Sequence, residues 1–146
     1  PANVIVWGGG MVGCEVADFL ANPGDNQLIG RTAVTLITSK KEVVLDMAPE
    51  TRALMMHRMR TNGVNIMGSA AIKEILADAV VIERNGQKET LRGVDLIVLA
   101  RGLKSADTLS EKLKGIVAEV HVIGDAREPR QAVEAIAEGS QIGRKL

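Results

Sequence analysis

Apolar and polar positions in the first part of the chain predict a strand, a helix and a second strand. Residues 3–7 form an apolar run rich in β-branched side chains, which is typical of a strand buried on both faces of a parallel sheet. From Met11 the apolar spacing becomes helical, and the helix is expected to end at 22–24. Its expected inward stripe consists of Val12, Val16, Phe19 and Leu20. A polar loop over 23–32 then leads to a buried strand at 33–38, which completes a βαβ unit.

The middle of the chain continues with a helix and then changes to short strands. Pro49 opens a helix that 62–63 closes, its Met cluster is expected to fill core space, and a brief strand follows at 64–67. Two or three short strands are expected between 70 and 91, with Asn85-Gly86 at a hairpin tip. This segment is therefore predicted to be an antiparallel meander.

The last part of the chain returns to longer apolar runs. Residues 94–100 and 120–123 are predicted strands, a short helix lies between them, and a final helix begins near Pro129. Its expected inward residues are Ala132, Val133, Ile136 and Ala137. This order of elements predicts a three-layer α/β fold with a parallel sheet, helices and a small antiparallel β-meander.

The composition of the 146 residues is that of a globular protein, with 46% hydrophobic and 25% charged residues. Lys+Arg and Asp+Glu number 18 each and aromatic residues are nearly absent, so the chain lacks the positive field and the stacking side chains of nucleic-acid binders. Its apolar runs are shorter than the roughly 20 residues of a membrane span, and no signal-peptide pattern is present. We therefore expect a cytoplasmic protein with neither a nucleic-acid partner nor a membrane.

Cys14 is the single cysteine, and the chain has two histidines. One cysteine cannot form an internal disulfide, and these three side chains cannot provide a zinc or iron–sulfur ligand set. We therefore expect a chain without a metal. The first residue is Pro1, which suggests either a piece of a longer protein or the removal of an initiator Met.

A glycine-rich turn follows the first predicted strand and opens the first helix. It satisfies G-x-G-x-x-G with Gly8, Gly9, Gly10, Met11, Val12 and Gly13. In such a turn the first glycine permits the tight bend, the second lets the backbone approach a pyrophosphate, and the third lets the helix pack closely on the strand. The positive end of the helix would hold the pyrophosphate charge. The pattern predicts a dinucleotide site in a Rossmann-like fold, and a tight turn without a ligand is the alternative.

The residues after the second predicted strand bear on which nucleotide binds. An acid there usually accepts hydrogen bonds from the adenosine ribose, but this chain has Ser39, Lys40 and Lys41 and no acid before Glu42. An ammonium group suits a 2′-phosphate, so NADP(H) is slightly favoured over NAD(H). Solvated loop charges, or a site that has lost its ligand, are the alternatives.

Five segments together resemble a known flavoprotein family. They are the glycine turn with residues 14–17, the strand at 34–37, the step Gly63-Val64, the segment VDLIVLARG at 94–102 and, above all, VIGDAREPR at 122–130. Over essentially its whole length the chain resembles the C-terminal portion of the NADH:flavin oxidoreductases related to 2,4-dienoyl-CoA reductase and trimethylamine dehydrogenase.

The resemblance implies a larger enzyme. In that family a TIM barrel with FMN and a [4Fe-4S] cluster precedes an FAD-type domain, into which an NAD(P)-binding domain is inserted. Residues 1–117 would then be the NAD(P)-binding-like Rossmann domain, and residues 118–146 the C-terminal segment of the FAD-type domain. The isolated chain is expected to lack the activity of the parent enzyme.

The resemblance also assigns cofactor-binding residues by position. The glycines that match the NAD(P)-binding domain and its exit are Gly8, Gly10, Gly13 and Gly102. Gly124-Asp125 resembles the motif whose aspartate binds the ribityl chain of FAD, and the helix after 128–130 would direct its N-terminus toward the flavin. From residue chemistry alone, a turn or N-cap role is the alternative for Asp125. Because only one glycine fingerprint is present, the chain would carry a partial FAD site.

The remaining candidates have structural alternatives. Cys14 is expected to be a packing residue, His57 to lie at the edge of an amphipathic helix face, and His121 to be structural. Trp7 could form the floor of the nucleotide crevice or end a core strand. Three arginines could contact cofactor phosphates or form surface ion pairs: Arg101, Arg127 and Arg130.

The expected function is that of a dinucleotide-binding module of a flavin-dependent NAD(P)H oxidoreductase, in which the cofactors carry the chemistry. The module would position NAD(P)H for hydride transfer to FAD, from which electrons pass to the cluster and FMN elsewhere in the parent. The chain lacks the acid that usually binds the adenosine ribose. This leaves a second alternative, in which the chain is a scaffold that binds no nicotinamide and belongs to a protein that passes electrons to a partner protein. A free-standing NAD-sensing domain is a third alternative, although it does not account for Gly124-Asp125.

Overall fold

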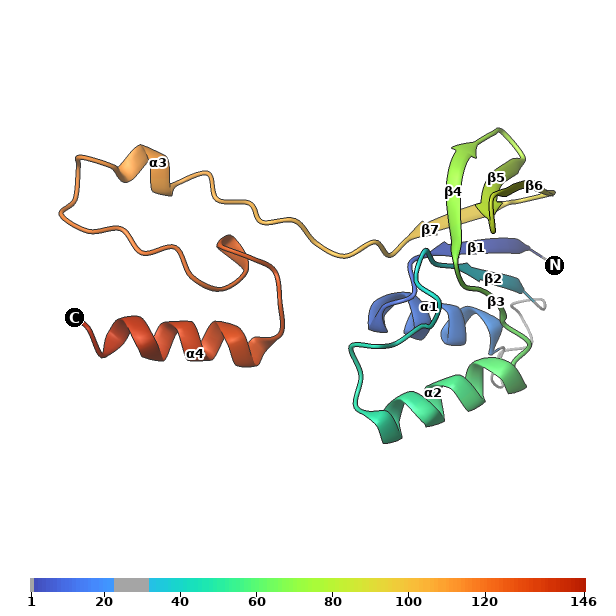
Figure 1. Ribbon diagram of the computed structural model, residues 1–146, viewed down its shortest axis with the longest axis horizontal. Helices are drawn as coiled ribbons and strands as arrows, with labels where there is room; N and C mark the ends of the chain where they lie inside the picture. Colours follow the sequence, from blue (N-terminus) through green and yellow to red (C-terminus); the bar gives the residue numbers. More distant parts are fainter. Residues whose placement is uncertain (1, 23–31) are drawn as a thin grey trace. The chain divides into compact units, whose positions relative to one another are not determined.

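The computed structural model describes residues 2–22 and 32–146, and the chain forms two compact units that divide after Gly102 (Figure 1). The polar loop predicted over 23–32 lies almost wholly outside the described residues. The boundary between 117 and 118, which the family resemblance implies, stays a prediction.

A four-stranded parallel sheet forms the centre of the first unit. Its strand order is β3 (Asn65–Met67), β2 (Ala33–Ile37), β1 (Asn3–Trp7) and β7 (Leu96–Leu99). Each pairing between neighbours is parallel. The strands expected in these four places therefore form, and β1 has the predicted bounds.

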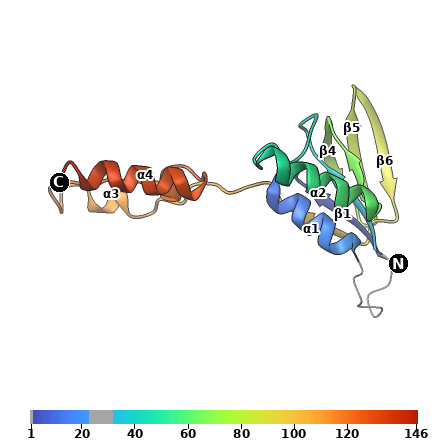
Figure 2. The same ribbon diagram turned by 90° about the horizontal axis from the view of Figure 1, so that it is seen from below.

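Helices cover one face of this sheet and a meander covers the other (Figures 1 and 2). The helices are α1 (Met11–Ala21) and α2 (Pro49–Thr61). The meander consists of β4 (Ala70–Ile75), β5 (Ala79–Arg84) and β6 (Gln87–Arg92), paired antiparallel in that order. The predicted three-layer α/β fold is confirmed. Among residues 2–22 and 32–146, no helix has both the length and the apolar composition that crossing a membrane requires.

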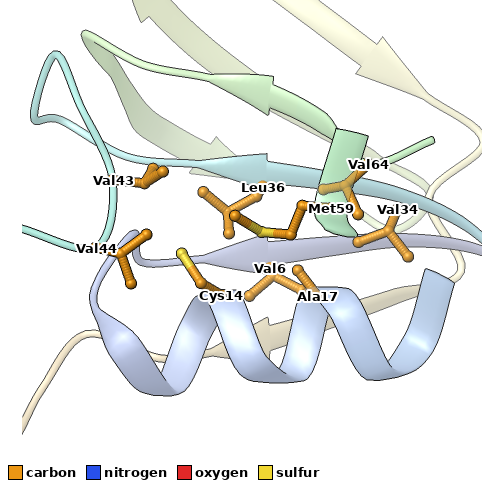
Figure 3. Packing of buried hydrophobic residues seen from close by; sticks show 9 residues of the cluster. All are labelled: Val6, Cys14, Ala17, Val34, Leu36, Val43, Val44, Met59 and Val64. Carbon is orange, nitrogen blue, oxygen red and sulfur yellow. The ribbon is translucent and has the colours of Figure 1, made fainter. Parts of the chain in front are cut away.

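Two apolar clusters hold the three layers together. The cluster on the helix side contains Val6, Cys14, Ala17, Val34, Leu36, Val43, Val44, Met59 and Val64 (Figure 3). The cluster on the meander side contains Ile5, Ile37, Met67, Ala70, Val80 and Ile82. Neighbouring residues of β1 and β2 thus belong to opposite layers, as the two-residue period of a strand requires. Met59 fills core space, as expected of the Met cluster.

The buried face of α1 differs from the predicted apolar stripe. Gly13, Cys14, Ala17 and Asp18 are buried, whereas Val12 and Phe19 are exposed. The prediction was wrong for these two residues, whereas Val16 and Leu20 of the predicted stripe are partly buried against the helix-side cluster. Close packing of the helix on β1 favours small side chains at the positions nearest the strand. The buried carboxylate of Asp18 accepts hydrogen bonds from the side chains of Arg58 of α2 and of Asn62, which follows α2.

The second unit contains a short helix α3 (Ser110–Leu113), a 3-10 turn η1 (Gly124–Ala126) and helix α4 (Ala132–Gly143). The strand predicted at 120–123 does not form. A strand requires a neighbour to bond its backbone groups, and within the described residues of this unit no strand lies beside the segment.

Helix α4 begins later than predicted, and its predicted inward face is exposed. Ala132, Val133, Ile136 and Ala137 all lie on the exposed side, and Val133 and Ile136 are 62% and 72% exposed. The opposite face, which carries Ala135, Glu138 and Gly139, packs on η1 and the residue before it. Apolar spacing predicted a buried stripe, but in this unit the contacts fall on the other face.

Candidate functional site

A crevice of about 370 Å³ lies at the carboxyl ends of β1, β2 and β7. Ligands of open α/β sheets bind in crevices at this end of the strands, and the volume is within the range of small-molecule sites. Of the predicted cofactor-binding residues, those that line the crevice are Gly8, Gly9, Gly10, Ser39, Lys40 and Gly102. Met11, Val12 and Gly13 lie in the first turn of α1, and Gly124 and Asp125 belong to the second unit.

The glycine turn makes backbone contacts that other residues cannot make. Gly8 has a φ of +137°, and a Cβ atom there would lie 2.0 Å from the carbonyl oxygen of Ala100. A Cβ atom at Gly13 would lie 2.0 Å from the carbonyl oxygen of Gly8. The tight bend and the close helix packing expected of these glycines are therefore present. At Gly10, the Cβ position is 3.3 Å from a carboxylate oxygen of Asp46.

Asp46 lies at the N-terminus of α1, where sequence reasoning placed no side chain. Its Oδ2 atom accepts a hydrogen bond of 3.0 Å from the Met11 N–H group. The two residues are 35 positions apart, and no local pattern in the sequence links them. A negative charge at this place is favourable because the helix dipole makes its N-terminus positive.

The loop after β2 is hydrogen-bonded to the segment before β4. The buried Thr38 donates its N–H to the carbonyl of Met67, and its hydroxyl accepts the Lys40 N–H at 3.3 Å. Glu42 forms a 2.6 Å ion pair with Arg52 of α2. Glu42, the acid that follows Lys40 and Lys41, is therefore paired with a residue of α2.

Trp7 and Arg101 lie together in the crevice wall. The Arg101 guanidinium carbon is 4.4 Å from the centroid of the Trp7 ring, which is the geometry of a cation–π contact. Both residues line the crevice, and the ring of Trp7 is only half-buried. Both alternatives for Trp7 are observed, because it ends the central strand β1 and also lines the crevice.

Cys14 and the histidines lie outside the crevice. The thiol of Cys14 is buried, burial raises its pKa to about 11, and it donates weakly to the Gly9 carbonyl at 3.7 Å. It is the packing residue that was expected. His57 is exposed on α2, and the exposed His121 contacts the Glu119 carboxylate at 3.0 Å.

In the second unit, Glu138 of α4 contacts the segment that contains Gly124-Asp125 and the two arginines after it. It accepts the Gly124 N–H at 2.7 Å and contacts the guanidinium groups of Arg127 and Arg130. The Gly124 hydrogen bond and then Arg130 lower the pKa of Glu138. The two arginines thus form ion pairs, the second of their alternatives, while the carboxylate of Asp125 is exposed in η1.

The family model of the pyridine nucleotide-disulphide oxidoreductases matches residues 1–139. The chain belongs to this family. The match confirms the Rossmann-like FAD/NAD(P)-binding fold, and the resemblance to flavin oxidoreductases is confirmed by the relatives described next. The domain family implies binding of two nucleotide cofactors, FAD and NAD(P)H.

The proteins to which this chain is similar include oxidoreductases that are much longer than the chain. A metal reductase of Desulforamulus reducens is 29% identical and covers 92% of this chain. An NADH oxidase of Thermoanaerobacter brockii is 28% identical over 96% of it. Histamine dehydrogenase from Rhizobium sp. 4-9 has the same fold, with a TM-score of 0.82 at 22% identity over 99% of this chain. The chain spans only 21% to 23% of the length of these three proteins.

Proposed function

We propose that the chain is the dinucleotide-binding module of a larger flavin-dependent NAD(P)H oxidoreductase. In this proposal the first unit holds NAD(P)H in the crevice at the ends of β1, β2 and β7 and positions it for hydride transfer to FAD. The observation that carries the proposal is the crevice itself, which the glycine turn Gly8 to Gly10 lines at the place where open α/β sheets bind ligands.

The charges of the crevice suit a dinucleotide. Among the described residues that line it none is acidic, and two, Lys40 and Arg101, are basic. The glycine turn, Gly8 to Gly10, lines the same crevice. The pyrophosphate would bind at this turn and at the N-terminus of α1, with Lys40 and Ser39 toward the adenosine end.

The same residues favour NADPH slightly over NADH. No acid lines the crevice to accept hydrogen bonds from a ribose, and Glu42 is engaged by Arg52. Lys40 supplies the ammonium group that a 2′-phosphate requires. The NADH oxidase among the relatives is named for the other nucleotide, so both nucleotides belong in the test.

The proposal assigns residues 118–146 to an FAD-type domain, and residues 1–117 to the NAD(P)-binding domain. Gly124, with φ +58°, and the exposed Asp125 form a partial FAD site, in which the carboxylate binds hydroxyl groups of the ribityl chain. The parent enzyme would hold an iron–sulfur cluster and FMN in other domains, and these groups would accept the electrons that FAD receives. The remaining domains of that cytoplasmic flavoenzyme are the partners of this chain, which alone is inactive.

A scaffold that binds no nicotinamide is the second candidate. The specific observation in its favour is the Asp46 carboxylate, which already accepts the Met11 N–H at the N-terminus of α1. The fold shared with histamine dehydrogenase is compatible with an amine-dehydrogenase-like parent that passes electrons to a partner protein. Direct measurement of nucleotide binding separates the two candidates.

Titration of the chain with NADPH and NADH, followed by amide NMR, tests the proposal. We expect concentration-dependent shifts of the amides from Gly8 to Gly13 and of Lys40. The amides of Asn85 and Gly86, which do not line the crevice, serve as an internal control. Energy transfer from Trp7, the single tryptophan, to reduced nicotinamide gives an independent readout. Absence of shifts at millimolar concentrations of both nucleotides would overturn the proposal in favour of the scaffold.

A further inference from the structure

The carboxylate of Asp46 lies where a nucleotide phosphate would bind. Its Oδ2 atom accepts the Met11 N–H at 3.0 Å, and the Cβ position of Gly10 is 3.3 Å from the same oxygen. The second glycine of the fingerprint is the one that lets a backbone approach a pyrophosphate. Asp46 therefore covers the approach that this glycine would otherwise leave open.

Two buried residues of the loop before α2 position the exposed Asp46. The side chains of Val43 and Val44 are buried, and the Val44 N–H donates to the carbonyl of Gly9 at 2.7 Å. The carbonyl of Val43 accepts the Nε–H of Arg52 at 3.0 Å. Val44 has a φ of +53°, which a β-branched residue rarely adopts, so these surrounding contacts hold the loop in its form.

The carboxylate and a phosphate compete for one donor. N–H groups in the first turn of a helix bind anions because they are unpaired within the helix and lie at its positive end. A phosphate oxygen at Met11 requires the same N–H group that Asp46 uses, and the two negative charges repel each other at short range. The basic residues Lys40 and Arg101, which line the crevice, attract the same ligand.

We propose that Asp46 sets the affinity of the dinucleotide site, an inference that rests on the proposed function. While the site is empty, its carboxylate takes the position of a phosphate oxygen at the N-terminus of α1. A dinucleotide binds by displacing the carboxylate from Met11. Removing the charge of Asp46 therefore tightens binding, although the same carboxylate stabilises α1 in the empty protein.

The test compares the 146-residue chain with its Asp46→Asn variant, which keeps the shape of the side chain and removes the charge. Dissociation constants for NADPH and NADH are measured by energy transfer from Trp7 and by amide shifts. We expect both constants to fall about tenfold, because both nucleotides contain the pyrophosphate. Glu42→Gln is the matched control: it removes the same charge from the same loop, but Glu42 pairs with Arg52. Its constants should change by less than about twofold.

A second readout requires no nucleotide. In the empty protein, Asp46→Ala removes the acceptor of the Met11 N–H, so the Met11 amide resonance should shift and the midpoint of urea unfolding should fall. Glu42→Gln should leave the Met11 resonance in place. An unchanged Met11 resonance in Asp46→Ala would overturn the inference at its first step.

The outcomes separate the inference from the proposed function. If the wild type binds a nucleotide with shifts from Gly8 to Gly13 and Asp46→Asn binds no more tightly, the inference is overturned and the proposed function stands. If neither protein binds NADPH or NADH, both are overturned. Equal tightening in Asp46→Asn and Glu42→Gln would indicate a general effect of charge and would overturn the role of the Met11 contact.

Discussion

The substitution Gly8→Ala tests how the end of β1 and the end of β7 approach each other. A Cβ atom at position 8 would lie 2.0 Å from the carbonyl oxygen and 2.6 Å from the carbonyl carbon of Ala100. Both are backbone atoms, so they cannot move aside as the end of a flexible side chain could. Gly8 also has a φ of +137°, which residues with a side chain rarely adopt.

The cost of Gly8→Ala has two parts. The backbone conformation costs roughly 1–2 kcal/mol for an L-residue with a side chain. Relieving the contact moves backbone apart by more than 1 Å, since ordinary contacts begin at 3.4 Å, and overpacking of this kind costs about 2 kcal/mol. The free energy of unfolding should therefore fall by about 3–4 kcal/mol, a large part of the roughly 5–15 kcal/mol of an ordinary domain.

Gly86→Ala is the control for a glycine at positive φ that has no close contact. Gly86 has a φ of +76° at the tip of the β5–β6 hairpin, and nothing lies within 4 Å of its Cβ position. This variant should lose only about 1 kcal/mol. Urea unfolding followed by far-UV circular dichroism measures both variants, since the fluorescence of Trp7 is affected by a change at the next residue.

Equal losses in Gly8→Ala and Gly86→Ala would refute the reasoning. They would mean that the backbone at Ala100 yields to the new Cβ atom without cost, so the close approach of β1 and β7 would not require a glycine. Nucleotide binding by Gly8→Ala, if the variant folds, should be lost together with the geometry of the turn.

Two further predictions concern charged contacts. Arg58→Met leaves the carboxylate of Asp18, which is 3% exposed, without its guanidinium partner, so the free energy of unfolding should fall by about 2 kcal/mol in the same urea assay. Arg60→Met, on the same helix, is the control. The Gly124 hydrogen bond holds the pKa of Glu138 below its ordinary value, so the contact stabilises the second unit above that value and is lost as pH falls through the lowered pKa. The Gly124 amide resonance should therefore move as pH falls below about 4.3.

The controls for these predictions lie within the same elements. If Arg58→Met and Arg60→Met lose equal stability, the Asn62 amide alone satisfies the buried carboxylate of Asp18. In Glu138→Gln, the Gly124 resonance should no longer follow pH in the acid range. A wild-type Gly124 resonance that is equally insensitive to pH would contradict the assigned contact.

Elements with local signals could be predicted from the sequence. β1 has the predicted bounds, and α2 begins at the predicted Pro49. Asn85 and Gly86 form the tip of the β5–β6 hairpin with φ of +52° and +76°, as a two-residue turn of this type requires. Each of these signals lies within a few residues of the element that it specifies, so the rest of the fold does not alter it.

Burial could not be predicted in the same way, because it depends on residues far along the chain. The buried carboxylate of Asp18 is bonded by Arg58 of α2 and by Asn62 after it, which lie 40 or more positions later. Val133 and Ile136 are exposed because η1 contacts the other face of α4. Apolar spacing identified the helices, but it could not identify their contacting faces.

The three glycines of the fingerprint differ in how strongly they support a bound ligand. Gly8 and Gly13 have Cβ positions 2.0 Å from backbone atoms, so the fold requires glycine there whether or not a nucleotide binds. Gly10 has no backbone atom near its Cβ position, and what lies there is the Asp46 oxygen at 3.3 Å. The motif therefore supports a nucleotide site through Gly10 and the crevice rather than through all three glycines. Competition for the Met11 N–H is the measurement that separates a nucleotide-binding turn from a structural one, because only a ligand has to displace Asp46.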